Sequence, residues 1–569
     1  MGLLRLQHGE KKAAMATIFY DSAFDDRVYV GDDLAPGRAV SATAWMGLAG
    51  LLEFLETRLG LGGLPVSEGE RCVHFAQALA GSEGFWNRSL DTDAVGTSRE
   101  ILRWVDELKM MGWAGAGCTD RIRQLSTVAS SVLPGIPDRL RSVLTELERT
   151  ADRIEPLTIH PVQPADDMPP LLGQVFADLV NRHGAVCEEI GIQDVEASGN
   201  LGASRARGFR PQPGDDSLVL LRTHTPWAAA EHVAAWLASL DDAGGTVVIG
   251  ATPELDATLA RFGLPTSGGT RPGPRANMLA SLIPLILGAA EPVPDPSRAL
   301  ELLTLPGGPF PSWVGRRLAR ALHEFPGIGN DGWTAVAGSL ATLAEERGHD
   351  GGERWESRVG AIFAGLLPDL YANSQREEIS ACLEAVLIPW LEERASASRH
   401  AGVYRAVHTA TRDLIELLEG RGSGPLEPGE FLRLWGEIPC AAGASLYPAE
   451  AGIDFVDSPG AVLAPARRII WWDFCGKNGR SSRPLPLSLE EYRDLADNGV
   501  HLQEFYHACA RCEPLRWQRP WRLCSETLVL ASPVLSATGD ASHPNPFWDE
   551  LCATMAGDNA PEILTRDGP

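Results

Sequence analysis

Lysine is the residue that this sequence most clearly lacks. Only four of the 569 residues are lysine, at positions Lys11, Lys12, Lys109 and Lys477. A phosphate-binding P-loop needs a lysine in the pattern Gly-x-x-x-x-Gly-Lys-Ser/Thr. Only Lys477 follows a glycine, and Trp471 and Asn478 stand where the first glycine and the hydroxyl residue belong. The sequence therefore excludes a conventional P-loop.

Long apolar runs are also missing. No run approaches the roughly 20 residues that a bilayer-spanning helix needs, and residues 1–14 lack the apolar core of a secretory signal peptide. We interpret residues 1–14 as an N-terminal tail or extension. The sequence predicts a cytoplasmic protein with no membrane partner.

The ten cysteines are scattered, so we expect no disulfide framework in a reducing compartment. One group merits attention, because Cys509 and Cys512 have C-x-x-C spacing and Cys475 and Cys524 lie nearby in the sequence. Four thiolates could hold zinc or an iron–sulfur cluster. However, the pair falls at the end of a stretch with a helical pattern and has no second closely spaced pair. We interpret all four as buried or incidental thiols and expect no cofactor.

Acidic residues outnumber basic ones by 75 to 50, which gives a net charge of −25. Such a surface repels DNA unless positive charge is concentrated locally. Arginine, which suits bidentate phosphate contacts, occurs in clusters, one of which is Arg316, Arg317 and Arg320. A coding bias toward arginine on solvated surfaces is the alternative interpretation. The predicted nucleic-acid contacts are Arg205, Arg207, Arg210, Arg271, Arg275, Lys477, Arg480, Arg483, Arg519 and Arg522.

Hydrophobic periodicity predicts a mostly helical region over residues 15–214. Buried strand patterns follow at residues 217–222 and 245–250, with helical patterns at 226–240 and 253–262 between and after them. Such alternation is typical of βαβ units in a parallel sheet. Strand patterns return at 453–456, 468–472 and 527–531. We therefore predict one α/β domain split into residues 215–300 and 440–555 by a helical insertion at 301–439, with a tail at 556–569.

The order of these segments resembles the UvrD/RecB-like superfamily 1 helicases, most closely the helicase-like part of AddB-type helicase–nuclease subunits. The segment Ser98-Arg-Glu-Ile-Leu-Arg-Trp-Val-Asp-Glu-Leu is similar to the N-terminal helical region of that family. The segment Thr225-Pro-Trp-Ala-Ala-Ala-Glu-His-Val is similar to the helix that opens its second motor domain. The resemblance spans residues 40–550 and implies a multi-domain α/β fold, in which the split domain is a degenerate RecA-like domain and the insertion is its helical subdomain.

The departures from the family pattern concern catalysis. Motif I is absent, and the motif V region reads Asp457-Ser-Pro-Gly-Ala-Val-Leu. Motif VI keeps Arg522 but not its usual neighbours. Phosphoryl transfer needs positioned cations and magnesium ligands, so we expect no ATP hydrolysis. No [DE]-x-K triplet lies in a setting that fits the nuclease signature, so we expect no nuclease domain and no catalytic residue.

The resemblance therefore implies a non-catalytic, DNA-binding accessory subunit that serves a helicase–nuclease assembly in recombination, repair or anti-phage defence. A helicase or nuclease partner would supply the chemistry. One alternative is a protein–protein scaffold that does not bind DNA. Another is an NTPase with an unconventional site, for which Asp473, after the strand pattern at 468–472, would be the magnesium ligand.

Overall fold

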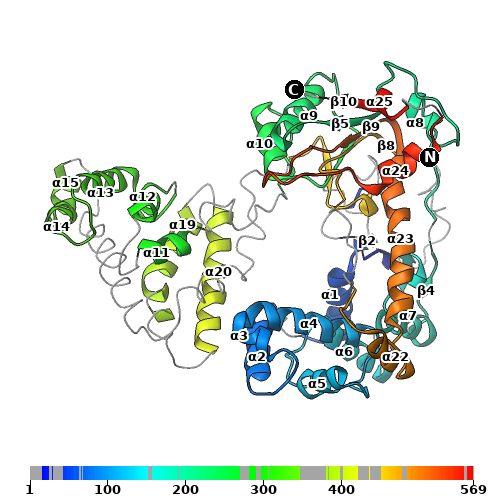
Figure 1. Cartoon of the computed structure of the whole chain (residues 1–569), viewed down its shortest axis with the longest axis horizontal. Helices are drawn as coiled ribbons and strands as arrows, with labels where there is room; N and C mark the ends of the chain where they lie inside the picture. Colours follow the sequence, from blue (N-terminus) through cyan, green and yellow to red (C-terminus); the bar gives the residue numbers. More distant parts are fainter. Residues whose placement is uncertain are drawn as a thin grey trace.

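The structure is a computed structural model, and it shows an α/β protein with two separate parallel β-sheets (Figure 1). It describes residues 16–22, 24, 28–29, 43–62, 66, 68–150, 157–189, 191–268, 281–289, 296–305, 307–346, 380–381, 383–397, 401–420, 435, 450–476, 484–556 and 560–567. No helix among these residues is long and apolar enough to cross a membrane.

The first sheet, sheet 1, lies in the N-terminal region and has the strand order β2-β1-β3-β4. Its strands are β1 (Ala16–Tyr20), β2 (Thr43–Met46), β3 (Leu157–Pro161) and β4 (Val186–Cys187), and all neighbouring pairs are parallel. Ile18 and Tyr20 of β1 and Leu157 and Ile159 of β3 point into one core. Three helices supply the rest of that core, namely α1 (Leu48–Leu59), α6 (Ile136–Arg149) and α7 (Pro170–His183).

Sheet 1 adds a small β-sheet to the region 15–214, which the sequence predicts to be mostly helical. Helices do dominate this region, but the sequence did not predict its sheet. The apolar pattern at about residues 44–61 predicts a helix, but Thr43–Met46 form β2, and α1 begins only at Leu48. These strands have at most five residues, so their alternating pattern is too short to stand out from the helical patterns beside it.

The second sheet, sheet 2, is larger and has the strand order β10-β5-β9-β8-β6-β7, again with parallel pairs only. It takes two strands from before the long helical segment and the others from after it. The strands are β5 (Leu218–Arg222), β6 (Thr246–Ile249), β7 (Asp454–Val456), β8 (Ala466–Trp471), β9 (Cys524–Ala531) and β10 (Thr565–Asp567). The five strand patterns seen in the sequence correspond to β5 through β9.

Sheet 2 is covered on both faces, as parallel sheets usually are. On one face, α9 (Pro226–Ala238) and α10 (Pro253–Arg261) pack on Val248, Ile470 and Val529. The other face carries α8 (Gly199–Ala203), α24 (Pro546–Thr554) and α25 (Ala560–Leu564). Burial on both faces explains why these strands read as continuous apolar runs in the sequence.

The C-terminal residues are part of this sheet rather than a tail. Thr565, Arg566 and Asp567 form β10 and pair in register with Leu220, Leu221 and Arg222 of β5. A three-residue edge strand carries almost no sequence signal, so the expectation of a tail over 556–569 was wrong for this segment.

A second group of N-terminal helices packs together beside sheet 1. It consists of α2 (Glu68–Ala80), α3 (Asn87–Thr92), α4 (Ala94–Met110) and α5 (Asp120–Ala129), and it is joined by α22 (Leu489–Asp497) from far along the chain. Phe75, Trp86, Val105 and Leu495 are among its buried residues. The contact with α22 is also polar, since Asp494 accepts hydrogen bonds from the backbone N–H groups of Cys118 and Thr119.

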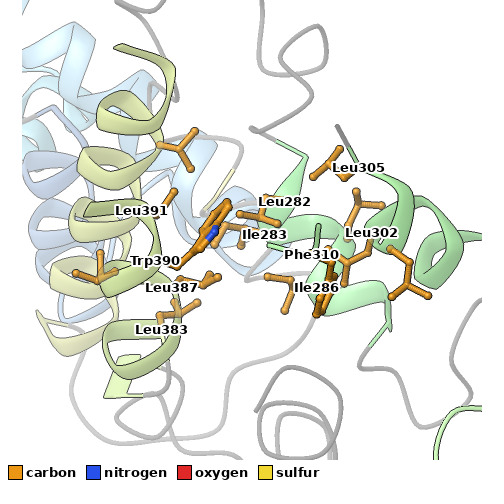
Figure 2. Close-up of a cluster of buried hydrophobic side chains, with 14 of the residues drawn as sticks. Leu282, Ile283, Ile286, Leu302, Leu305, Phe310, Leu383, Leu387, Trp390 and Leu391 are labelled. Carbon is orange, nitrogen blue, oxygen red and sulfur yellow. The ribbon is translucent and has the colours of Figure 1, made fainter. Parts of the chain in front are cut away.

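The segment between α10 and β7 forms a separate helical core at one side of the molecule (Figure 1). Its described helices are α11 (Leu282–Ala289), α12 (Pro296–Thr304), α13 (Ser312–Glu324), α14 (Asp331–Gly338), α15 (Leu340–Glu346), η4 (Leu383–Leu387), α19 (Ile388–Ala397) and α20 (Ala401–Gly420). Figure 2 shows Trp390 and Leu387 facing Ile283 and Ile286 across this core. Helix α20 also contacts α2 of the N-terminal region.

One long helix, α23 (Leu502–Leu523), joins the two sheet regions. It begins beside α22, contacts the turn after β3, and leads directly into β9 of sheet 2 (Figure 1). Proline occurs within it at Pro514 and Pro520. The helix therefore lies where side chains can reach the carboxyl ends of the sheet 1 strands.

Candidate nucleic-acid interface

Two arginines of α23 form a buried ion-pair network with two aspartates of the N-terminal region. Asp21 directly follows β1, and Asp167 lies in the short helix η2 (Ala165–Asp167) after β3. Because β1 and β3 are parallel neighbours, both aspartates lie at the same edge of sheet 1. This is the edge at which open α/β sheets bind their ligands.

The geometry of the network is compact. Arg516 Nη2 lies 3.1 Å from Asp21 Oδ1 and also donates to Asp167 Oδ2. Arg519 Nη2 lies 2.9 Å from Asp21 Oδ2, and its Nη1 donates to the backbone oxygen of Gly460. Gly460 belongs to η5 (Pro459–Ala461), which follows β7 of sheet 2. Asp21 is 0% exposed and Arg519 is 5% exposed. The network therefore ties the strand ends of sheet 1 to sheet 2.

Burial and the neighbouring carboxylates have opposite effects on the pKa values of the two arginines. Burial favours a lower pKa for the Arg516 guanidinium, but Asp21 and Asp167 outweigh it and leave that pKa raised. Burial dominates at Arg519 and lowers its pKa despite Asp21. Arginine keeps its proton in either case, so the network holds two positive and two negative charges. Because the charges balance, this edge of sheet 1 offers no surplus positive charge to the phosphates of a nucleotide.

Three of the predicted DNA contacts instead bond within the protein. Arg519 belongs to the buried network, and Arg522 Nε lies 2.5 Å from Asp194 Oδ1. Arg205 donates to the backbone oxygens of Val195, Trp521 and Cys524. Sequence clustering could not separate these arginines from surface arginines, because their acceptors lie in distant segments. Each of the three therefore has partners within the protein, and contact with DNA stays a prediction for them.

Of the other seven predicted contacts, two are exposed in the structure and five lie outside the described residues. Arg207 and Arg210 are exposed in the loop between α8 and β5, where a phosphate could reach them. Five predicted contacts fall outside the described residues, namely Arg271, Arg275, Lys477, Arg480 and Arg483.

The four cysteines considered as metal ligands differ in their surroundings and in the groups that they contact. Burial raises the pKa of Cys509 to about 12, with Asp167 adding to the effect, and burial also raises the pKa of Cys512. Cys524 is buried in β9, where its Sγ lies 3.1 Å from the backbone oxygen of Thr527. The Sγ of Cys475 lies 3.3 Å from Asp473 Oδ1. In the described part of the chain, no group of three or more His, Cys, Asp or Glu side chains is placed to hold a metal.

A different arginine cluster lines an open cavity of about 290 Å³ on the helical segment. Arg316, Arg317 and Arg320 come from α13, together with Trp313, and Leu343 of α15 completes the lining. The sequence showed the three arginines as a cluster, but they were not among the predicted contacts, and Trp313 was missed. A tryptophan followed by arginines three, four and seven positions later was the available signal, because this spacing places all four on one helix face.

Comparison of the sequence with protein-family models and with curated proteins found no match.

Proposed function

We propose that this chain is a non-catalytic, DNA-binding accessory subunit of a helicase–nuclease assembly that acts in recombination, repair or defence against foreign DNA. In this proposal, sheets 1 and 2 are a pair of degenerate RecA-like motor domains, and the helices between α10 and β7 are the inserted subdomain. A partner helicase or nuclease supplies ATP hydrolysis and strand cleavage.

The observation that carries the proposal is the buried network of Asp21, Asp167, Arg516 and Arg519. A working motor places a phosphate-binding loop and magnesium ligands at the ends of its strands. Here that edge of sheet 1 carries two carboxylates whose charges are balanced by arginines from α23. In a working motor, this edge lies at an interface that opens and closes around a nucleotide, whereas here buried ion pairs join it to α23. In this proposal, the chain keeps the motor architecture for binding DNA, and a partner carries out ATP hydrolysis and strand cleavage.

A protein–protein scaffold without DNA binding is the second candidate. The net charge of −25 favours it, and so does the internal use of Arg205, Arg519 and Arg522. The exposed pair Arg207 and Arg210 and the cluster on α13 favour DNA binding instead.

The test is to purify the full chain from its native host under nuclease treatment and to identify co-purifying proteins by mass spectrometry. The proposal expects a helicase or nuclease chain in stoichiometric amount, and a reconstituted complex whose DNA processing depends on this subunit. A complex that processes DNA equally well without it would contradict the accessory role. Stoichiometric partners unrelated to DNA would support the scaffold.

A further inference from the structure

We propose that the cavity on α13 is a binding site for single-stranded nucleic acid, in which Trp313 stacks on one base and Arg316, Arg317 and Arg320 bind the flanking phosphates. This inference deepens the proposed function and rests on it, because it names the form of nucleic acid and the site that holds it.

The first argument is the arrangement of charge. Arg316 and Arg320 are one helical turn apart, as are Arg317 and Arg320, and like charges at this spacing destabilise a helix. All three side chains are exposed, and none forms an ion pair with another described residue. The exposed Glu345 and Glu346 of α15 do not pair with them. In a chain with 25 excess negative charges, positive charge of this density without an ion pair among the described residues favours an anionic ligand.

The second argument is the aromatic side chain in the same cavity. Trp313 is half-buried and packs against the core of the helical segment, while part of it lines the cavity. A charged groove beside an aromatic platform is the arrangement that proteins use to bind single strands, because every base offers a flat face for stacking. Bases within a duplex are already stacked on one another. The cavity therefore favours a single strand over a duplex.

The third argument is that the cluster sits on a rigid support. Val314, Leu318 and Leu322, on the opposite side of α13, are buried in the helical core. Gly315 allows close packing on α12, since a Cβ at this position would lie 2.0 Å from the Leu303 backbone oxygen. Arg316 Nε donates to the Ser312 oxygen at 3.0 Å, which orients the side chain along the helix. The helix that carries the site is thus held in place before a ligand binds, which lowers the cost of ordering.

The experiment measures fluorescence anisotropy of a labelled oligothymidylate of 20 nucleotides and of a duplex of equal length, with the full chain. Charge reversal at Arg316, Arg317 and Arg320 to Glu should weaken single-strand binding at least tenfold. It should also lower the slope of log affinity against log salt by about 2, since each phosphate contact with a single strand contributes about 0.7. The matched control reverses Arg88, Arg149 and Arg493, which are exposed elsewhere, and should change affinity less than threefold.

Trp313 is tested separately by two substitutions that keep an apolar side chain at this position. Trp313→Leu should weaken single-strand binding by about 5- to 150-fold, the effect of losing one base–aromatic stack. Trp313→Phe should retain most of the affinity, because a stacking face remains. Circular dichroism confirms that each variant is folded. Duplex binding that equals single-strand binding and is insensitive to Trp313→Leu would overturn the assignment.

The remaining outcomes separate this inference from the function on which it rests. Tight DNA binding that survives the arginine reversal would overturn this site and leave a DNA-binding subunit with its interface elsewhere. No DNA binding by the wild-type chain or by its complex would overturn both. Poly-L-glutamate could also displace the oligonucleotide. If it does, and if Trp313→Leu leaves its binding unchanged, the arginine cluster is assigned to an acidic protein segment instead.

Discussion

At the scale of single residues, arginine has two roles in this protein, and burial distinguishes them. Arg205 and Arg519 bond to distant segments of the chain, whereas Arg316, Arg317 and Arg320 project from a helix into an open cavity. The same side chain serves both roles because its fork of donors suits a carboxylate, a backbone carbonyl or a phosphate equally. Clustering in the sequence therefore indicates surplus positive charge but not its use.

A matched pair of substitutions on α23 tests this distinction. Arg519→Met removes a buried partner of Asp21 and should lower the free energy of unfolding by about 3–5 kcal/mol, the cost of breaking a buried ion pair. Arg522→Met removes a partner of Asp194, where the arginine side chain is 29% exposed, and should cost about 0–1 kcal/mol. Denaturant unfolding of both variants gives the comparison. Equal costs would mean that the buried network does not hold the sheets together.

At the scale of elements, the helical segment depends on close contacts between helices as well as on apolar side chains. Its core combines Trp390 and Leu387 with Ile283 and Ile286 (Figure 2). Helix α13 has two different faces, one buried in this core and one carrying the arginines. The position of α13 against α12 therefore affects the stability of the segment, whereas the cavity itself is lined by α13 and α15.

Glycine substitutions test the contact between these two helices. Gly315→Ala places a methyl group 2.0 Å from the Leu303 oxygen, so α13 must shift, at a cost of about 1–3 kcal/mol for overpacking. Gly173→Ala in α7 is the control, since nothing lies within 4 Å of its added Cβ, and it should stabilise by up to about 1 kcal/mol. Thermal unfolding followed by circular dichroism measures both. A harmless Gly315→Ala would show that α12 and α13 are not closely packed.

At the scale of the whole molecule, the two sheets are joined through α23 and its buried ion pairs. The sequence resemblance suggested motor domains, and the structure shows two parallel sheets with a fixed polar contact between them. Because buried ion pairs hold the two sheet regions together, we expect ATP, the ligand that drives domain motion in a helicase motor, to have little effect on this protein.

Addition of Mg·ATP tests this expectation. A ligand present at 100 times its dissociation constant stabilises a protein by about 2.7 kcal/mol, so a bound nucleotide would raise the melting temperature. We expect no shift in melting temperature and no ATP turnover by the isolated chain. Turnover that is abolished by Asp473→Ala would instead support an unconventional NTPase.

The sequence by itself determined those elements whose signal is local. The apolar runs of β5 through β9 and the helices α9 and α10 were predictable, because strands buried on both faces and helices that begin with proline leave continuous patterns. The absence of a P-loop also followed from the lysines alone. For the candidate site, the sequence located the arginine clusters but not their partners.

The tertiary structure decided everything that depends on distant partners. Strands β1, β2 and β10 are stabilised by pairing with neighbours rather than by their own few residues. Asp21 meets Arg519 across 498 positions of sequence, and Asp494 meets Thr119 across 375. Such contacts follow from chain topology and burial, which local periodicity does not encode. For the same reason, only the folded chain shows which arginines are buried in ion pairs and which remain available to a ligand.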